Sequence, residues 1–498
     1  MTVPTCDLLV IGGGINGAAV ARDAAGRSLK VVLAERGDYA CATSSASSKL
    51  IHGGLRYLEH YQFALVRESL RERDVMLRIA PHLVRPMRFL VPVYRDSPRP
   101  AWLLRLGLTV YDFLAGSHNP AKSGRLPERE VAALPRLRRE DLGAVLHYTD
   151  CQVDDARLVL ATLLDARARG ADIANRREVV SIAPCGDGYS VELSERGHYR
   201  TWHARFVINA AGPWVNRVLD LSPAALPQHD LCLVRGSHLL LPMPTPRQSD
   251  GFTLQHADGR VVFVTPWLDG RHLMVGTTDV AHVGDPGNAR CSPQERDYLL
   301  DLYNRHFIHP GGPVGPAHIV WSWAGVRALV DDGTLDPSRI TREERIVSGR
   351  QGSGGLVTIY GGKLTTHRRV AERVIRVLGR LGCATGRKWT SESPLVGGAL
   401  DRRGLAKLFR SAPEHLHPAV ARRWVSTYGD IAATLFEAVR SDTKKARNIA
   451  PGVPLAELEH AVANEDALSA EDFLFRRTRL FLSLDARGRS AVQAWFAR

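Results

Sequence analysis

The chain has 498 residues, which corresponds to about three structural units at roughly 150 residues per domain. Hydrophobic residues make up 44% and charged residues 24% of the chain, as in ordinary globular proteins, so the composition excludes a disordered, collagenous or multi-pass membrane protein. The 66 basic and 52 acidic residues leave a net charge of +14. This excess indicates an anionic partner such as a phosphorylated substrate, a nucleotide, nucleic acid or an anionic lipid surface.

Several kinds of site and segment are not expected from this sequence. The 7 cysteines are scattered and form no C-x-x-C pair, so we expect no metal site, no disulfide framework and a reducing compartment. The first apolar run, Leu8–Ile11, ends at once in glycines, which argues against a signal peptide. The longest apolar stretch, Trp102–Ala115, carries Arg105 and Asp112 and is shorter than the ~20 residues of a membrane-spanning helix. The basic residues are spread along the chain without a recognition module, so we expect no nucleic-acid partner.

The start of the chain predicts a strand, a glycine turn, a helix and a second strand, at Asp7–Ile11, Gly12–Gly17, Ala18–Arg27 and Lys30–Glu35. The turn has the spacing Gly12-x-Gly14-x-x-Gly17, and Glu35 ends the second strand. This is the dinucleotide-binding fingerprint in its full structural context.

Each part of the fingerprint has a physical role. Gly12 permits the turn, Gly14 lets backbone N–H groups approach a pyrophosphate, and Gly17 lets the helix touch the strand. The helix N-terminus favours negative charge, and Glu35 can accept hydrogen bonds from ribose hydroxyls. A merely structural glycine turn would need neither the acid nor both strands. The pattern therefore predicts a nucleotide site.

The rest of the chain alternates between strand and helix patterns. After a helix at Phe63–Ile79 come an arginine- and proline-rich segment at 81–100, a loop and helix at 149–170, and short strands at 179–182, 189–193 and 206–209. β-rich runs fill 231–280, and a strand with a glycine turn at 356–362 precedes a helix at 363–378. Beyond Gly397 the spacing is helical, at 405–409, 419–428, 431–439, 455–465 and 470–481. We infer a nucleotide domain built from separated segments, an inserted β-rich domain and a helical domain.

Five further motifs accompany the fingerprint in order along the chain. They are Cys41–Glu59 (CATSSASSKLIHGGLRYLE), Ser322–Arg327 (SWAGVR), Ile340–Arg342 (ITR), Tyr360–Thr366 (YGGKLTT) and the tail Asn464–Leu480. With these motifs the chain resembles the FAD-dependent sn-glycerol-3-phosphate dehydrogenases of respiratory metabolism, over almost its whole length. Two positions depart from the family pattern: Ala328 stands where proline is usual, and His367 where tyrosine is frequent.

The resemblance implies an α/β FAD-binding domain of glutathione-reductase type (Rossmann-like), an inserted β-rich substrate domain and a C-terminal all-α cap domain. We expect the FAD-binding domain at 1–80, 150–225 and 340–385. The substrate-binding and membrane-facing domain is expected at 81–149 and 226–339, and the cap at 390–498. The expected reaction is oxidation of sn-glycerol 3-phosphate to dihydroxyacetone phosphate, with hydride transfer from C2 to FAD and electrons passed to ubiquinone or menaquinone.

The resemblance also assigns residues to the cofactor. The fingerprint residues hold its pyrophosphate and ribose, and Val179 meets the adenine through its backbone. The remaining residues expected around FAD are Thr43, Ser44, Ser48, Ala211, Gly212, Asp279, Lys363, Leu364 and Thr365.

A dianionic phosphate favours arginine forks, a lysine point charge and a tyrosine hydroxyl. By resemblance, these are Arg56, Tyr57, Arg327, Arg342 and Lys363.

The acceptor of the hydroxyl proton is left open. His52 is the first candidate, because a neutral imidazole can act as a base near pH 7, and His238 is the second. Arg327, which with Lys363 completes the expected catalytic residues, could instead hold the developing alkoxide electrostatically.

For the membrane, we expect a peripheral protein on the inner face of the cytoplasmic membrane and a homodimer. The segment Arg85–Gly116 mixes arginines with large apolar residues, a pattern that can bind an anionic interface with a helix in its plane. The alternative is an ordinary amphipathic helix packed on the core. Arg476, Arg477 and Arg479 near the C-terminus are open to dimer or membrane contacts.

Three alternative functions stay open at this point. One is an oxygen-using glycerol-3-phosphate oxidase, because oxygen access depends on channel shape. Another is an FAD-dependent amine or amino-acid oxidase, which needs a carboxylate site and has less use for so many cations. The third is a nucleotide-fold binding scaffold without catalysis, since fold alone does not establish activity.

Overall fold

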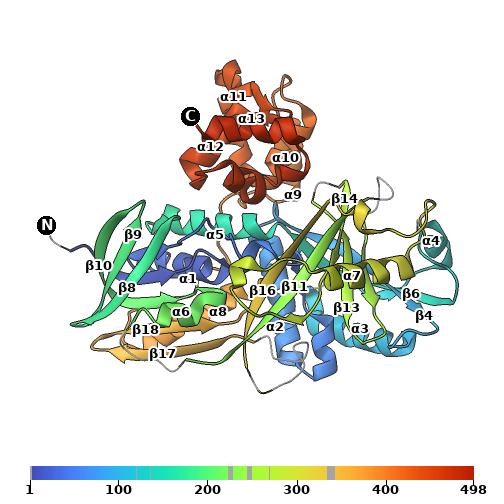
Figure 1. Ribbon diagram of the computed structural model, residues 1–498, viewed down its shortest axis with the longest axis horizontal. Helices are drawn as coiled ribbons and strands as arrows, with labels where there is room; N and C mark the ends of the chain where they lie inside the picture. Colours follow the sequence, from blue (N-terminus) through green and yellow to red (C-terminus); the bar gives the residue numbers. More distant parts are fainter. Residues whose placement is uncertain are drawn as a thin grey trace.

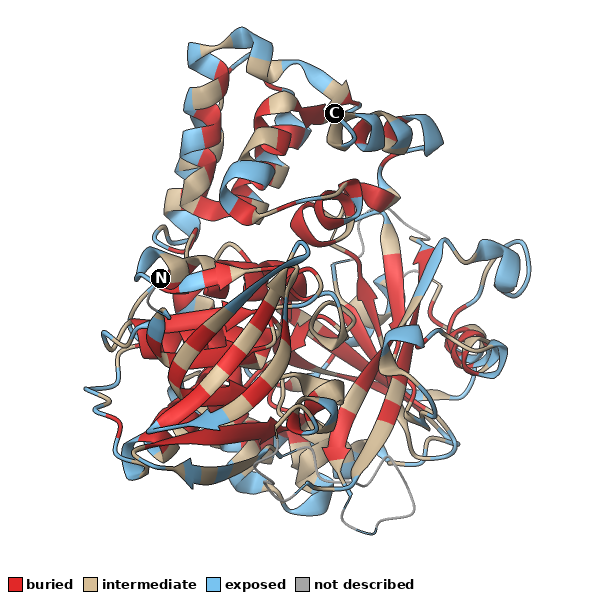
Figure 2. Cartoon of the chain, turned by 60° about the vertical axis from the view of Figure 1, so that its left-hand side comes forward, coloured by how far each residue is buried: buried red, intermediate tan, exposed pale blue. Residues whose placement is uncertain are grey.

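The computed structural model describes residues 3–118, 120–134, 136–222, 228–243, 249–268, 270–331, 333 and 343–498. Two sheets lie side by side, and the helices of the last part of the chain sit above them (Figure 1). Figure 2 shows that the centres of both sheets are buried. No helix among the described residues is long and apolar enough to cross a membrane.

The first sheet has a parallel centre in the order β18-β10-β1-β2-β7, formed by Gly354–Tyr360, His198–Asn209, Thr5–Ile11, Val31–Ala34 and Asp172–Ala174. Leu8, Leu9 and Val10 of β1 are all inaccessible to solvent, because both faces of this sheet are covered. Three antiparallel strands complete it: β17 (Arg345–Gln351) on β18, and β9 (Gly188–Glu195) between β10 and β8 (Arg177–Cys185).

Three helices pack on one face of the first sheet: α1 (Ile15–Ala25), α5 (Asp155–Ala168) and α8 (His367–Arg380). The small side chains Ala18, Ala21 and Ala24 of α1 are fully buried, which allows this close packing. A second core on the other face joins β1 to the β8–β9–β10 layer and to the short helix α6 (Val215–Leu219). The predicted helix at Ala18–Arg27 therefore begins three residues earlier, directly after Gly14.

The second sheet is almost entirely antiparallel, in the order β15-β11-β14-β13-β12-β4-β6-β3. These strands are Val280–Ala281, Leu231–Pro242, His272–Gly276, Val261–Pro266, Gly251–Gln255, Val84–Tyr94, Leu142–Val153 and Leu50–Ile51, with β16 (Trp321–Val330) on β11 and β5 (Gly124–Arg125) on β6. Helix α7 (Pro293–His306) packs on one face, and α2 (Phe63–Ile79) and α3 (Ala101–Ala115) on the other. The short helix α4 (Glu128–Ala133) follows β5.

The arginine- and proline-rich segment at 81–100 contains the long strand β4. Its prolines are tolerated because β4 pairs with β12 only through Phe89 and Leu90. Pro86 and Pro92 therefore lie where one side of the strand lacks a partner strand, which is where a residue without an N–H fits.

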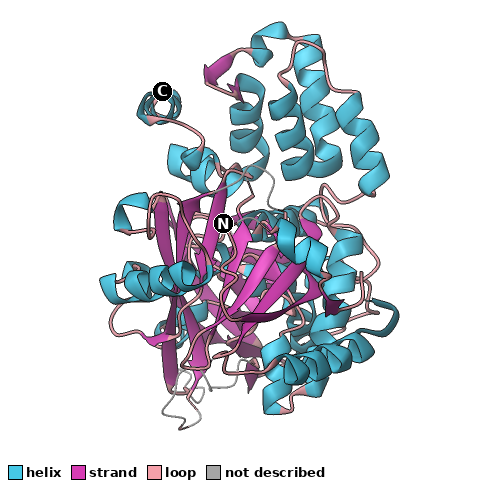
Figure 3. Cartoon of the chain, turned by 90° about the vertical axis from the view of Figure 1, so that its right-hand side faces the viewer, coloured by secondary structure: helices cyan, strands magenta, loops and turns pink. Residues whose placement is uncertain are grey.

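The last part of the chain is almost entirely helical (Figure 3). Its helices are α9 (Arg402–Arg410), α10 (Pro418–Tyr428), α11 (Ala432–Ser441), α12 (Leu455–Glu465) and α13 (Ala486–Phe496), with a small ladder of β19 (Asn448–Ala450) and β20 (Val453–Pro454). Trp424 and Phe436 form one fully buried core and Phe473 anchors a second. The predicted helix at 470–481 is instead a π-helical turn, Asp472–Arg477, followed by a 3₁₀ turn, Leu480–Leu482.

The predicted helix at Phe63–Ile79 is confirmed with both its ends, whereas the helix predicted from Lys363 begins at His367. Gly361 and Gly362 have φ of +71° and +95°, and the chain needs a further turn before it can enter the helix.

The domain boundaries stay a prediction. Within the predicted segment 1–80, β3 pairs with β6 and the first part of α2 packs on the second sheet, whereas Val75, Met76 and Ile79 at the end of α2 pack in the core of the first sheet.

A buried ion-pair network joins α8 to α2. The Arg368 guanidinium donates to the Glu72 carboxylate at 2.8 and 2.5 Å, and it also contacts Glu372 and the Thr390 hydroxyl. The side chains of Arg368 and Glu72 are 7% and 4% exposed. Breaking such a pair leaves an uncompensated buried charge.

We expect Arg368→Met to lower the free energy of unfolding by about 3–5 kcal/mol, because the buried Glu72 carboxylate loses the guanidinium that pairs with it. Arg78→Met is the matched control. Arg78 pairs with Asp74 on the surface of α2, where its side chain is 56% exposed, so its loss should cost about 1 kcal/mol or less. Urea unfolding of both variants, with the same cofactor content, measures the difference. Equal midpoints for the two variants would contradict the prediction.

Candidate functional site

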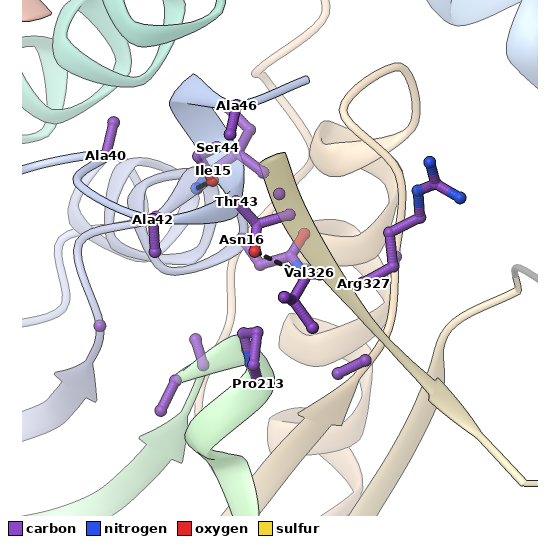
Figure 4. Close-up of a pocket in the computed structure, with 18 of the residues that line it drawn as sticks. Ile15, Asn16, Ala40, Ala42, Thr43, Ser44, Ala46, Pro213, Val326 and Arg327 are labelled. Carbon is purple, nitrogen blue, oxygen red and sulfur yellow. Dashed lines mark hydrogen bonds between the residues drawn. The ribbon is translucent and has the colours of Figure 1, made fainter. Parts of the chain in front are cut away.

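A long cavity of about 700 Å³ opens where the two sheets meet. It is lined by the ends of β1 and β2, the start of α1, the loop 40–48, strand β16 and the turn 361–365. Figure 4 shows the part around the start of α1, with Thr43 and Ser44 of the loop on one side and Val326 of β16 facing them. This volume is in the range of cofactor and ligand pockets.

The glycines of the fingerprint make backbone approaches that no other residue permits. A Cβ on Gly17 would lie 1.9 Å from the Gly12 carbonyl oxygen, and one on Gly12, whose φ is +111°, would lie 2.7 Å from the Ala210 oxygen. Gly14 is the N-cap of α1 and lacks a side-chain cap. Gly14, Ile15 and Asn16 line the cavity, so the N-terminus of α1 adjoins it, as in a pyrophosphate site.

Glu35 stands at the end of β2 and lines the same cavity. Its two carboxylate oxygens accept hydrogen bonds from the Gly13 and Gly37 amides, both at 2.7 Å. Burial raises the pKa of Glu35, while these two amides act in the opposite direction. Each oxygen keeps a further lone pair, so the carboxylate is oriented and still able to accept from ribose hydroxyls.

The loop 43–48 is tied to three different elements. Ser44 accepts a hydrogen bond from the Ile15 amide at 3.0 Å, and the Thr43 hydroxyl donates to the Val326 carbonyl at 2.6 Å. Ser48 contacts the His238 ring nitrogen at 2.9 Å. These hydroxyls fix the loop along the cavity. Each has already made one hydrogen bond within the protein, so only its remaining donor or acceptor sites are available to a cofactor.

The remaining predicted cofactor residues, apart from Asp279, also line the cavity. Val179 comes from β8, and Ala211 and Gly212 come from the turn after β10. Leu364 and Thr365 lie in the turn before α8, and the Thr365 hydroxyl accepts a hydrogen bond from the His52 amide at 3.2 Å. The structure thus brings three segments that are far apart in the sequence to the wall of one cavity.

A group of charged residues gathers around another part of the cavity. The Lys363 ammonium lies 3.7 Å from the centre of the Tyr57 ring. Arg327 on β16 pairs with Asp279 and donates to the Thr277 hydroxyl at 3.2 Å. Arg56 approaches the same Asp279 carboxylate at 3.6 Å. Asp279, predicted to bind the cofactor, thus contacts two of the predicted substrate residues, and its role stays a prediction.

Arg342, the last predicted substrate residue, lies outside the described residues. The two departures from the family pattern are both in place near the site: Ala328 lines the cavity, and His367 is buried at the start of α8, in contact with the Leu364 carbonyl at 2.6 Å. Burial lowers the pKa of His367 to about 4.

The two candidate proton acceptors have different surroundings. His52 lines the cavity, with its ring edge on Phe263 at 6.2 Å between centres. His238 is 2% exposed, and its ring stacks on Trp323 at 5.0 Å. Burial lowers the pKa of His238 to about 3, helped by the nearby charges of Lys49 and Arg327.

Sequence reasoning missed several residues of the cavity, among them Asn16 and Arg36. The Asn16 side chain donates to the Gly361 carbonyl at 2.9 Å and so joins α1 to the glycine turn. Arg36 lies over the Trp214 ring, 4.7 Å from its centre, beside Glu35. Asn16 lies inside the fingerprint and Arg36 directly follows Glu35, so their position next to known motifs was the available signal.

Two family models match the chain. The first, described as FAD dependent oxidoreductase, covers residues 7–368, and the second, the C-terminal domain of alpha-glycerophosphate oxidase, covers residues 388–497. The aerobic glycerol-3-phosphate dehydrogenase of Escherichia coli (strain K12) is 40% identical over 99% of this chain and 97% of its own length. The chain belongs to the FAD-dependent glycerol-3-phosphate dehydrogenase family.

Two further relatives frame this assignment. The D-erythritol 1-phosphate dehydrogenase of Brucella abortus (strain 2308) is also 40% identical, over 99% of this chain and 98% of its own. The crystal structure of the glycerol-3-phosphate dehydrogenase from Bacillus halodurans with FAD matches with a TM-score of 0.80 and 28% identity, over 99% of this chain and 90% of that one. The predicted fold class, the FAD cofactor and the enzyme class are confirmed.

The residues of the cavity fit FAD. The glycine cradle at the start of α1 suits its pyrophosphate, and Glu35 suits the ribose. We assign the isoalloxazine to the part lined by Ser48, His52 and Leu364, because the charged groups at Arg327 and Lys363 adjoin it. These residue assignments remain predictions.

The buried neutral His238 predicts a pH dependence. Its pKa is about 3 in the folded protein and about 6.5 in an unfolded chain, so the unfolded state binds the proton more tightly between these values. The contribution of His238 to the free energy of unfolding therefore decreases as pH falls from about 6.5 to about 3.

We expect His238→Gln to lose stability less steeply than the wild type when pH is lowered through this window. Thermal unfolding midpoints measured in steps from about pH 7 to about pH 4 provide the comparison. His198→Gln, which removes an exposed histidine of β10, should keep the wild-type slope. The prediction fails if His238→Gln keeps that slope as well.

Proposed function

We propose that the protein oxidises sn-glycerol 3-phosphate to dihydroxyacetone phosphate and passes the electrons to a membrane quinone, ubiquinone or menaquinone. The observation that carries this proposal is the charge balance of the residues beside the flavin part of the cavity. Arg56, Arg327 and Lys363 carry three positive charges, and Asp279 carries one negative charge. Together with Arg342, which lies outside the described residues, these groups carry a positive excess, and such an excess suits a phosphate ester dianion.

Different residues of the cavity have different roles in the proposed reaction. When bound, FAD supplies the acceptor for the hydride that leaves C2 of the substrate. Arg56, with Arg342 and the Lys363 point charge, holds the phosphate. Arg327 stands on the strand that lines the cavity and stabilises negative charge developing on the C2 oxygen.

His52 takes the hydroxyl proton in this scheme. His238 is the weaker candidate, because burial lowers its pKa to about 3 and Ser48 occupies one ring nitrogen. We assign His238 the role of fixing Ser48 and thereby the loop beside the flavin.

A second substrate of the same chemical class is D-erythritol 1-phosphate. The relative named for it is as similar to this chain as the glycerol-3-phosphate dehydrogenase of E. coli, at 40% identity each. Both molecules are phosphorylated polyols with a secondary hydroxyl, so the charge balance above serves either one.

The deciding experiment is anaerobic. The holoprotein in mild detergent is mixed with sn-glycerol 3-phosphate, its enantiomer or D-erythritol 1-phosphate, and the flavin absorption band is followed. We expect bleaching by sn-glycerol 3-phosphate and not by its enantiomer. Faster bleaching by D-erythritol 1-phosphate would make it the preferred substrate, and bleaching by none of them would overturn the substrate class. Reoxidation by a quinone analogue, compared with reoxidation in air, tests the acceptor.

Arg56→Met tests the phosphate contact. We expect KM for the phosphorylated substrate to rise on the order of 10- to 100-fold with a smaller fall in kcat, because a hydrogen bond to a charged group is lost. Arg95→Met is the control, since that side chain is 88% exposed and pairs with Asp141 only at 3.9 Å. Unchanged KM in Arg56→Met would remove Arg56 from the phosphate site.

We also propose peripheral attachment to the inner face of the cytoplasmic membrane, through α3. The predicted segment Arg85–Gly116 is not one helix, because β4 occupies its first part. Arg99 pairs with Glu59, and Arg105 donates to the Ser123 hydroxyl at 3.1 Å, so these arginines are partly engaged within the protein. The support comes from apolar side chains of α3 that face solvent: Trp102, Leu103, Leu106 and Phe113, which are 69%, 42%, 57% and 82% exposed.

Large apolar side chains exposed along one helix are typical of a helix that lies in a membrane interface. We expect the triple variant Trp102→Ser, Leu106→Ser, Phe113→Ser to lose co-sedimentation with vesicles containing phosphatidylglycerol. The control Tyr199→Ser, Val283→Ser changes two large exposed residues outside α3, which are 68% and 93% exposed, and should bind as the wild type does. Equal sedimentation of both variants would overturn the attachment through α3. The expected homodimer stays a prediction.

A further inference from the structure

The C-terminal helical part holds the rest of the molecule through arginines of the segment 476–479. The sequence leaves these residues open to dimer or membrane contacts, but the structure places all three against carboxylates of the FAD-binding part. The backbone of this segment explains why the three arginines point toward the protein interior. The π-helical turn Asp472–Arg477 and the left-handed Arg479, with φ of +60°, direct the segment inward.

Asp38 is the first anchor point. The Arg477 guanidinium donates to both carboxylate oxygens of Asp38, at 2.7 and 2.8 Å, and both side chains are 1% exposed. Arg476 and the Asn175 amide, the latter at 2.8 Å, complete the set of donors. Asp38 follows Glu35 by three residues. The turn after the ribose-binding strand is therefore pinned by the C-terminal segment.

Asp155 is the second anchor point. It accepts from the Arg479 guanidinium at 2.5 Å, from the Lys49 ammonium at 2.7 Å and from the Ser47 hydroxyl at 2.7 Å. Asp155 is fully buried and Lys49 is 1% exposed. Because Lys49 and Ser47 end the loop that lines the cavity, Arg479 supports this loop through Asp155.

Most residues of the loop 38–49, which lies between Asp38 and the Lys49 partner of Asp155, line the FAD cavity. Residues 40–44 and 46–48 contribute to its wall, and Ser44 and Thr43 are bonded to the start of α1 and to β16. Neither Arg477 nor Arg479 lines the cavity itself. An effect of either residue on FAD must therefore act through the loop.

We propose that Arg477 and Arg479 are positioning residues that hold the loop 38–49 in place along bound FAD, so that the C-terminal part controls how slowly FAD dissociates. The proposal rests on the FAD cavity and is independent of the substrate. Removing either arginine leaves a buried carboxylate with fewer counter-charges. The loop then gains alternative positions in which a carboxylate reaches solvent, and FAD loses part of its wall.

The test compares rates of FAD release without substrate. Purified holoprotein is diluted, and the rise in free FAD fluorescence is followed for Arg477→Met and Arg479→Met. We expect release to become faster on the order of tenfold or more in both, because each change breaks a buried ion pair. Arg477→Lys and Arg479→Lys keep the charge but lose the planar fork, so they should lie between the Met variants and the wild type.

The matched control is Glu465→Gln. It breaks an ion pair between α12 and α5, from Glu465 to Arg157 at 2.8 Å, whose side chains are 1% and 5% exposed. This pair joins the same two parts of the molecule. The Glu465 carbonyl accepts from the Arg477 guanidinium at 2.8 Å, and the substitution leaves this carbonyl in place. FAD release should stay within about twofold of the wild type, since the loop keeps both anchors.

Equal acceleration in all three variants would overturn the proposal in favour of a general docking effect, and unchanged release in both arginine variants would overturn it directly. If Arg477→Met does not fold, Arg479→Met decides the matter, because its side chain is 11% exposed and lies at the edge of the contact. With FAD in excess, Arg479→Met should still be reduced by substrate. Failure of the proposed reaction would appear as no reduction in the wild type, and the release rates would remain interpretable.

Discussion

The contact between Gly17 and Gly12 is the constraint on which the rest of the site depends. The space for a Cβ at Gly17 is taken by the Gly12 carbonyl, which would lie 1.9 Å away, so α1 can begin directly against the end of β1 only with glycine there. This approach puts the first amides of α1 beside the turn and Glu35 across from them. The loop 43–48 then has a fixed surface to bind, through Ser44 and the Ile15 amide. A side chain at Gly17 would displace all of these together.

Buried charge pairs distribute the stability of the molecule around this contact. Arg368 joins α8 to α2 and thus the two sheets, while Arg477 and Arg479 join the C-terminal part to the loop beside FAD. Such pairs are costly to bury and costly to break singly. They therefore specify relative positions of elements more than they add net stability. The cofactor cavity lies where these connected parts meet.

The charged end of the cavity is organised by one carboxylate. Asp279 binds both Arg327 and Arg56, so it orients two guanidinium groups and lowers their mutual repulsion without neutralising the group. Together with Lys363 these groups keep a positive excess. Such an excess suits an anionic ligand.

Much of this protein was determined by its sequence alone. The fingerprint around Gly12, the apolar run of β1 and the period of the helix at Phe63–Ile79 are local patterns, because spacing and side-chain size act within a few residues. The contacts of Asp279, the strand in the proline-rich segment and the inward arginines at 476–479 were decided only by the tertiary structure. Asp279 meets Arg56, far away in the chain, only after folding. The composition of the proline-rich segment does not show its partner strands, and the sequence leaves Arg477 open to dimer or membrane contacts until Asp38 is brought against it. In each case the deciding partner lies hundreds of residues away or on a neighbouring strand, and no local pattern carries that information.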